Sequence, residues 1–238
     1  MKKKSRVADL QQFESIIGYE FGDLALLDQA LSHSSYTRER REEELNDNER
    51  LEFLGDAFFD AIIGEALYKM FPDAEEGRLS KMRASIVCEA SLAQAAKRIE
   101  LADYLLLGYG EEKNGGRHRE SILADATEAV VGAIYLDGGY EYVKAFVLNT
   151  FEKELQDAKD GKFLNKDFKS ALQEELQAAG IHGIKYILEK EEGPDHDKTF
   201  TVRLEVNEKP VGHGTGKSKK TAEQAAAKQA LERGIDAF

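Results

Sequence analysis

Asn48-Glu49-Arg50-Leu51-Glu52-Phe53-Leu54-Gly55-Asp56-Ala57-Phe58-Phe59-Asp60 combines acidic and apolar side chains at helical spacing. On a helix that turns about 100° per residue, Glu49, Glu52 and Asp56 fall within roughly 60° of one another. Apolar residues, including Leu51 and Phe58, occupy the opposite face. The stretch predicts an amphipathic helix with an acidic face, which an ordinary solvated helix would also have.

A second stretch, Ser121 to Leu136, consists almost entirely of small and apolar residues and predicts a helix buried on most sides. Asp125 and Glu128 stand three residues apart in it and therefore share one side of one turn. A buried carboxylate without a partner costs several kcal/mol, so the two acids need cations or a metal. Few basic residues lie in the stretch, whereas a second acidic helix nearby would complete a cage for a divalent cation. Oxygen ligands favour magnesium, manganese or calcium over zinc.

The composition predicts a soluble, helix-rich protein. The chain has 238 residues, of which 33% are charged, 42% are hydrophobic and only three are proline. No stretch approaches the roughly 18 apolar residues of a membrane span. The basic start, Met1 to Arg6, is not followed by an apolar segment, so we expect a cytoplasmic protein. The single cysteine, Cys88, excludes an internal disulfide framework and a multi-cysteine zinc site.

The pattern changes after the first two-thirds of the chain. Residues 1–156 are predicted to form an all-helical domain, residues 157–166 a polar linker, and residues 167–238 a small α+β domain. The predicted order in the second domain is α-β-β-β-α, with helices at 167–179 and 218–233. The strands are expected at 185–189, 199–206 and 211–215, because these segments alternate or lie between turn residues.

Charge is distributed unevenly between the two parts. The net charge of −12 comes entirely from residues 1–160, which hold 20 Lys and Arg against 32 Asp and Glu, whereas residues 161–238 hold 13 of each. Phosphate binding would therefore depend on local clusters. Lys217, Lys219 and Lys220 stand at the predicted start of the last helix, where amides and the helix dipole favour anions, although a solvated basic helix start has the same pattern.

Further polar side chains, Ser170, Gln173, His196 and Lys198, could contact sugars and phosphates without reading bases. Double-stranded RNA is bound largely in this way, through its shape and 2′-hydroxyl groups. No strand rich in aromatic residues suggests base stacking, which disfavours single-strand binding.

Both parts of the chain resemble a known family. The segment from Asn48 to Asp56 closely resembles the signature of bacterial ribonuclease III, and residues 167–233 resemble a double-stranded-RNA-binding domain. The second similarity lies in Leu172-Gln173-Glu174, in the 193–196 loop and in the run from Gly216 to Ala227. With Glu75-Glu76-Gly77 and Ile122 to Ala129, the resemblance covers nearly the whole chain in the expected order.

The resemblance implies a metal-dependent endoribonuclease that cuts double-stranded RNA as a homodimer and leaves 5′-phosphate and 3′-hydroxyl ends. It also implies processing of ribosomal RNA precursors and other structured transcripts, with Mg²⁺ as the metal, Mn²⁺ as a possible substitute and no organic cofactor. The residues carried over are the metal ligands Glu52, Asp56, Asp125 and Glu128, the accessory acids Glu49 and Glu76, the dimer residue Phe53, and the RNA-binding residues Ser170, Gln173, Glu174, His196, Lys217, Lys219 and Lys220. A plain core aromatic is the other interpretation of Phe53.

The sequence is also compatible with two functions of other classes. A pure double-stranded-RNA-binding regulator would keep the lysines but would not need acids on an apolar helix. A metal phosphohydrolase acting on small nucleotides would keep the acids but would not need the C-terminal domain.

Overall fold

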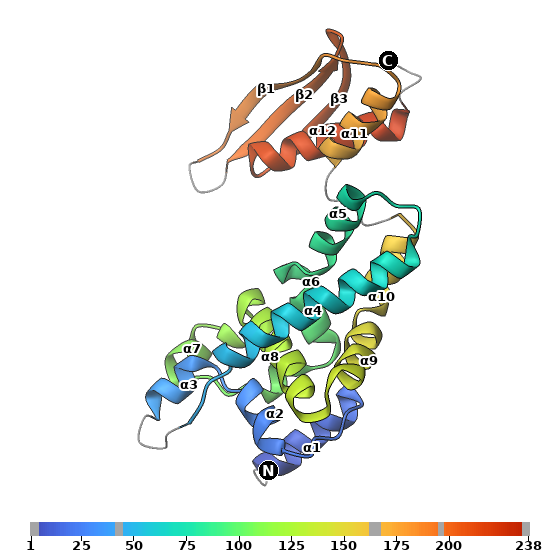
Figure 1. Cartoon of the computed structure of the whole chain (residues 1–238). Helices are drawn as coiled ribbons and strands as arrows, with labels where there is room; N and C mark the ends of the chain where they lie inside the picture. Colours follow the sequence, from blue (N-terminus) through green and yellow to red (C-terminus); the bar gives the residue numbers. More distant parts are fainter. Residues whose placement is uncertain (1–4, 41–44, 162–167, 195–197, 235–238) are drawn as a thin grey trace. The chain divides into compact units, whose positions relative to one another are not determined.

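A computed structural model describes residues 5–40, 45–161, 168–194 and 198–234. Figure 1 shows helices throughout the first part of the chain and a sheet with two helices in the last part. The chain divides into two compact units, Met1–Asp160 and Gly161–Phe238. Within the described residues, no helix is both long enough and apolar enough to cross a bilayer.

The first unit is helical, which confirms the predicted class. Its long helices α4 (Glu49–Met70) and α8 (Glu120–Gly138) pack against each other. Around them lie α1 (Arg6–Ile17), α2 (Leu24–Ala30), α3 (Ser34–Glu39), α5 (Glu76–Ile86), α6 (Glu89–Arg98), η2 (Leu101–Tyr104), α7 (Tyr109–Lys113), η3 (Gly116–His118), α9 (Tyr140–Thr150) and α10 (Glu152–Lys159).

The contact between α4 and α8 depends on two glycines. A Cβ atom built on Gly55 would lie 1.7 Å from the carbonyl oxygen of Glu128, and one on Gly132 would lie 2.3 Å from the carbonyl oxygen of Leu51. Both distances are impossible for a real side chain, so glycine is required where the two backbones touch. Nearby, the rings of Phe58 and Tyr135 stack with centroids 3.6 Å apart.

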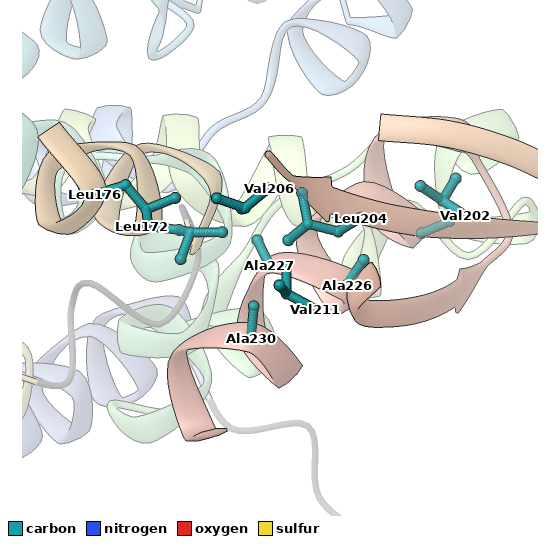
Figure 2. Close-up of a cluster of buried hydrophobic side chains, with 10 residues drawn as sticks. Leu172, Leu176, Val202, Leu204, Val206, Val211, Ala226, Ala227 and Ala230 are labelled. Atoms are coloured by element: carbon teal, nitrogen blue, oxygen red, sulfur yellow. The ribbon is translucent and has the colours of Figure 1, made fainter. Parts of the chain in front are cut away.

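The second unit has the predicted α-β-β-β-α order. It consists of α11 (Phe168–Ala178), β1 (Ile184–Glu192), β2 (Thr199–Val206), β3 (Lys209–Gly216) and α12 (Lys219–Arg233). The sheet is antiparallel in the order β1-β2-β3. Leucines of α11, valine and leucine of the strands and alanines of α12 form its core (Figure 2).

Glycines of β3 let α12 lie directly on the strand. A Cβ atom on Gly212 would lie 2.4 Å from the carbonyl oxygen of Ala226, and one on Gly214 would lie 2.2 Å from that of Ala222. The facing residues of α12, including Ala222 and Ala226, are fully buried alanines. Small side chains on both surfaces therefore fix the position of α12 and of the lysines at its start.

The structure differs from several sequence-based boundaries. Strand β3 begins at Lys209, before the predicted start at 211, because Lys209 and Pro210 pair with β2. Residues 157–159, predicted as linker, belong to α10, because Leu155 and Ala158 are buried in the first unit and extend the helix through a polar segment. Strand β1 continues to Glu192, beyond the predicted 189, because Lys190, Glu191 and Glu192 pair with β2 after a bulge.

Candidate functional site

Three carboxylates meet where α4 crosses α8. Glu52 comes from α4, and Asp125 and Glu128 come from α8. One oxygen of each lies within 4.8 Å of the others, so the three could share a metal ion. The close backbone approach at Gly55 brings the two helices near enough for this arrangement.

The acidic cluster of Glu52, Asp56, Asp125 and Glu128 carries uncompensated negative charge. Burial raises the pKa of Glu128 to about 8, and the charges of Asp56, Glu52 and Asp125 add to the effect. Burial, assisted by Asp125, Glu49 and Asp56, also raises the pKa of Glu52. Among the described residues, no Lys or Arg forms an ion pair with any of the four. An all-carboxylate donor set without a lysine or arginine partner fits a hard divalent cation.

The remaining predicted acids lie at different distances from this cluster. Asp56 is exposed, but its charge acts on Glu128 and Glu52. Glu49 is exposed, pairs with Arg38 at 3.5 Å, and acts on Glu52. Glu76 starts α5, where its carboxylate accepts a hydrogen bond from the Ser80 hydroxyl, and it is not among the acids that shift the pKa values of the cluster. The accessory role of Glu76 stays a prediction.

Two residues beside the cluster were not identified from the sequence. Burial raises the pKa of Asp125, the Glu89 carboxylate at the start of α6 raises it further, and His33 opposes the rise. Both residues are distant from Asp125 in the sequence and neither belongs to an acidic motif, so only the tertiary structure reveals them.

The raised pKa of Glu128 predicts a pH-dependent stability in metal-free protein. In the folded chain the Glu128 carboxyl group stays protonated up to about pH 8, whereas the ordinary pKa of a glutamate is 4.5. The contribution of Glu128 to the free energy of unfolding is therefore fully present below pH 4.5 and is lost as the pH rises toward 8. In EDTA at pH 8, we expect the melting temperature of Glu128→Gln to lie roughly 2–4 °C above that of the parent. This corresponds to a gain of about 1 kcal/mol in the free energy of unfolding, after allowance for solvent screening. The difference in melting temperature should shrink toward pH 5. Melting curves that differ by the same amount at both pH values would contradict the assignment.

Phe53 is not a core residue. Its side chain is 79% exposed, although it stands between acidic-face and core positions on α4. The core interpretation is therefore wrong, and an exposed large aromatic at this place is available to a partner molecule.

The lysines of the second unit surround the start of α12. Lys217, Lys219 and Lys220 are exposed, and Ser218 caps the helix through a reciprocal capping box with Thr221. Lys217 lies 3.4 Å from the Thr199 hydroxyl. Three cationic side chains therefore gather at a helix N-terminus, which is an anion-binding arrangement.

The predicted RNA contacts on α11 are only partly exposed. Gln173 and Glu174 are exposed, whereas Ser170 is half-buried. Lys198, next to the loop, pairs with Glu191 at 2.8 Å. His196 lies outside the described residues.

Comparison with known proteins agrees with both units. A family model described as ribonuclease-III-like matches residues 23–155, and one described as a double-stranded RNA binding motif matches residues 168–233. Ribonuclease 3 of Desulforamulus reducens is 49% identical over 232 residues, 98% of this chain and 93% of that protein. Ribonuclease 3 of Caldanaerobacter subterraneus is 49% identical over 224 residues, 94% of this chain and 97% of that protein.

A solved structure is also similar to the first unit. The nuclease domain of ribonuclease III from Campylobacter jejuni, described with a flexible region involved in dimer formation, matches with a TM-score of 0.57 and 43% identity. The match covers 61% of this chain and 97% of that domain. Together these similarities leave no place for a pure RNA-binding regulator or a small-nucleotide phosphohydrolase. The chain belongs to the ribonuclease III family and is an endoribonuclease that acts on double-stranded RNA.

Proposed function

We propose that the chemistry of this endoribonuclease takes place at the acidic cluster, with Glu52, Asp56, Asp125 and Glu128 holding Mg²⁺, for which Mn²⁺ can substitute. The observation that carries the proposal is the convergence of carboxylates from α4 and α8, with which no lysine or arginine of the described residues forms an ion pair. Mutual repulsion in a partly buried site favours proton or cation uptake, and an ion relieves the repulsion without protonating the ligands.

When bound there, a divalent ion supplies Lewis-acid activation of water and stabilises charge on phosphate oxygens. Asp125 and Glu128 on one turn of α8, together with Glu52 and Asp56 on α4, would hold the ion. Glu49 and Glu76 act as accessory acids in this proposal. Attack by water, not by the 2′-hydroxyl, leaves a 5′-phosphate and a 3′-hydroxyl.

The proposed active form is a homodimer in which each protomer cuts one strand. Phe53 supports this proposal because a side chain that is 79% exposed on α4 gains by burial against a second copy. The dimer formation described for the Campylobacter jejuni nuclease domain supports it as well.

The second unit supplies RNA affinity in this proposal, through Ser170, Gln173, Glu174, His196, Lys217, Lys219 and Lys220. We assign residues 1–156 and the end of α10, to Lys159, to the nuclease domain, and residues 167–238 to the RNA-binding domain. Precursors of ribosomal RNA and other structured transcripts in the cytoplasm are the proposed substrates.

The test uses purified full-length protein and a long RNA duplex labelled at either end. We expect cleavage with Mg²⁺ or Mn²⁺, no cleavage in EDTA, and fragments that a 5′-phosphate-dependent exonuclease degrades. Cleavage that persists in EDTA, or fragments with 2′,3′-cyclic phosphate ends, would exclude the metal-dependent mechanism.

The lysines of α12 should set the salt dependence of RNA binding. In the double variant Lys219→Ala and Lys220→Ala, we expect weaker binding of duplex RNA. The slope of a plot of log Kd against log salt concentration should fall by about 1 for each lysine lost. Filter binding in EDTA at several salt concentrations measures this slope. Lys228→Ala, from the middle of the same helix, is the matched control, and an equal effect there would show that the helix start has no special role.

A further inference from the structure

A hollow of about 500 Å³ in the second unit is lined by α11, by the turn that follows it and by strand β1. Leu172 and Leu176 of α11 belong to the core (Figure 2), whereas Gln173 and Gln177, each one residue further along the helix, are exposed. The two glutamines stand four residues apart, so they share one side of α11. Both line the hollow, together with His182 from the turn that leads into β1.

The turn that carries His182 is fixed on both sides. The Ile181 N–H donates to the Leu176 carbonyl at 2.7 Å, and the Ile181 side chain packs against the core. The carbonyl of Gly183, whose φ of +92° favours glycine, accepts the Asn207 N–H at 3.3 Å. His182 itself is exposed and forms no hydrogen bond or ion pair with any residue that the structure describes. A fixed backbone therefore presents an imidazole whose nitrogens are open to a ligand.

The hollow offers polar groups without a spare positive charge. The ammonium of its one lysine, Lys169, lies 2.6 Å from the Glu223 carboxylate and 4.4 Å from the centre of the Tyr186 ring. The other side chains are the two amides, the imidazole, the tyrosine and two isoleucines. A phosphate is bound best by free cations, whereas a ribose needs hydrogen-bonding groups for its hydroxyls and apolar contact for its carbons. The lining therefore suits a sugar better than a phosphate.

The RNA surface proposed for this unit reaches the hollow. Gln173 belongs both to the proposed RNA contacts and to the lining. Duplex RNA displays its 2′-hydroxyl groups in a wide and shallow minor groove, and proteins bind it there through its shape and these hydroxyls. Because the hollow connects Gln173 to His182, a strand that lies on Gln173 can extend to the imidazole.

We propose that His182 is a further RNA-binding residue of the second unit, whose imidazole forms a hydrogen bond with a ribose 2′-hydroxyl while the sugar lies in the hollow. The inference rests on the proposed RNA-binding role of Gln173. It gives His182 no contact with phosphate, which distinguishes this residue from the lysines at the start of α12.

Two substitutions and one control separate binding from folding. His182→Ala removes the imidazole, whereas His182→Gln keeps a side chain that can donate and accept hydrogen bonds. His213→Ala is the matched control. His213 is an exposed histidine of β3, and it points away from α12 because its neighbours Gly212 and Gly214 contact that helix.

The experiment measures the Kd of full-length protein for duplex RNA and duplex DNA by filter binding in EDTA at several salt concentrations, together with the melting temperature. We expect His182→Ala to weaken RNA binding about three- to tenfold, as loss of one neutral hydrogen bond does. The slope of log Kd against log salt concentration should not change, because no phosphate contact is lost. Duplex DNA lacks the 2′-hydroxyl, so its Kd should be the same for the parent and His182→Ala. His182→Gln and His213→Ala should bind RNA within about twofold of the parent, with all melting temperatures unchanged.

Parental RNA affinity in His182→Ala overturns the inference, and a reduced salt slope does so as well, because it would reveal a phosphate contact. An equal loss in both His182 variants with lowered melting temperatures would show that the residue only supports the turn. Gln173→Ala is measured in parallel. If it binds RNA like the parent, the proposed RNA surface on α11 is itself misassigned. If Gln173→Ala loses affinity while His182→Ala does not, only the role of His182 is wrong.

Discussion

Glu128→Gln is expected to abolish cleavage of duplex RNA, with a loss on the order of 10³-fold or more in kcat, and to leave RNA binding intact. The substitution keeps the size of the side chain but removes the charge of the most strongly perturbed carboxylate in the acidic cluster. The C-terminal lysines and α11 are untouched. Single-turnover cleavage with saturating Mg²⁺ and duplex binding in EDTA measure the two effects separately.

Glu120→Gln is the matched control for this prediction. Glu120 is an exposed residue at the start of the same helix, and it forms an ion pair with Lys97 at 3.6 Å. We expect its kcat to stay within about threefold of the parent, because an exposed pair contributes little. If Glu128→Gln and Glu120→Gln cleave equally well, the chemistry does not depend on the cluster.

Gly55→Ala is expected to have the second largest effect, because it damages the fold and the site together. The new Cβ would lie 1.7 Å from the Glu128 carbonyl oxygen, and a backbone atom cannot turn aside as a side chain can. Helices α4 and α8 must separate, at a cost of about 3 kcal/mol or more, which corresponds to a fall of roughly 6–12 °C in melting temperature.

The same displacement moves Glu52 away from Asp125 and Glu128. A shift of ~1 Å at a reacting centre can cost about 100-fold in rate, so cleavage by the folded fraction should fall by at least that factor at 20 °C. Gly64→Ala is the control on the same helix, since its Cβ would meet only the Arg83 side chain, at 3.9 Å. We expect that variant to be stabilised by about 0.5–1 kcal/mol. Similar losses in both variants would indicate a general intolerance of α4 to substitution.

The sequence predicted those parts of the structure that depend on local pattern. The acidic face of α4, the apolar length of α8 and the α-β-β-β-α order follow from periodicity and turn residues, and the structure contains each of them. Resemblance to the family added the pairing of Glu52 with Asp125 and Glu128, which no spacing rule gives. Cleavage and binding assays on variants of these residues decide whether the residues have the proposed roles.

What the sequence did not reveal depends on contacts between distant segments. Gly55 and Gly214 are ordinary helix and strand glycines until a second backbone lies against them. Glu89 influences Asp125 because α6 packs on α8, and His33 acts on Asp125 from the segment that follows α2. The polar composition of residues 157–159 predicts a linker, and only the packing of α10 shows that Ala158 is buried.

The backbone contact at Gly55 and Gly132 has a consequence for how the site responds to ligands. The spacing between the two carboxylate-bearing helices is set by main-chain atoms, which have no alternative rotamers. The backbones that carry the proposed ligands Glu52, Asp125 and Glu128 therefore keep one spacing with or without an ion or RNA, which would lower the reorganisation energy of the proposed site. Temperature should accordingly change the cleavage rate smoothly until the two helices part, and activity should then end with the cooperative unfolding of the first unit.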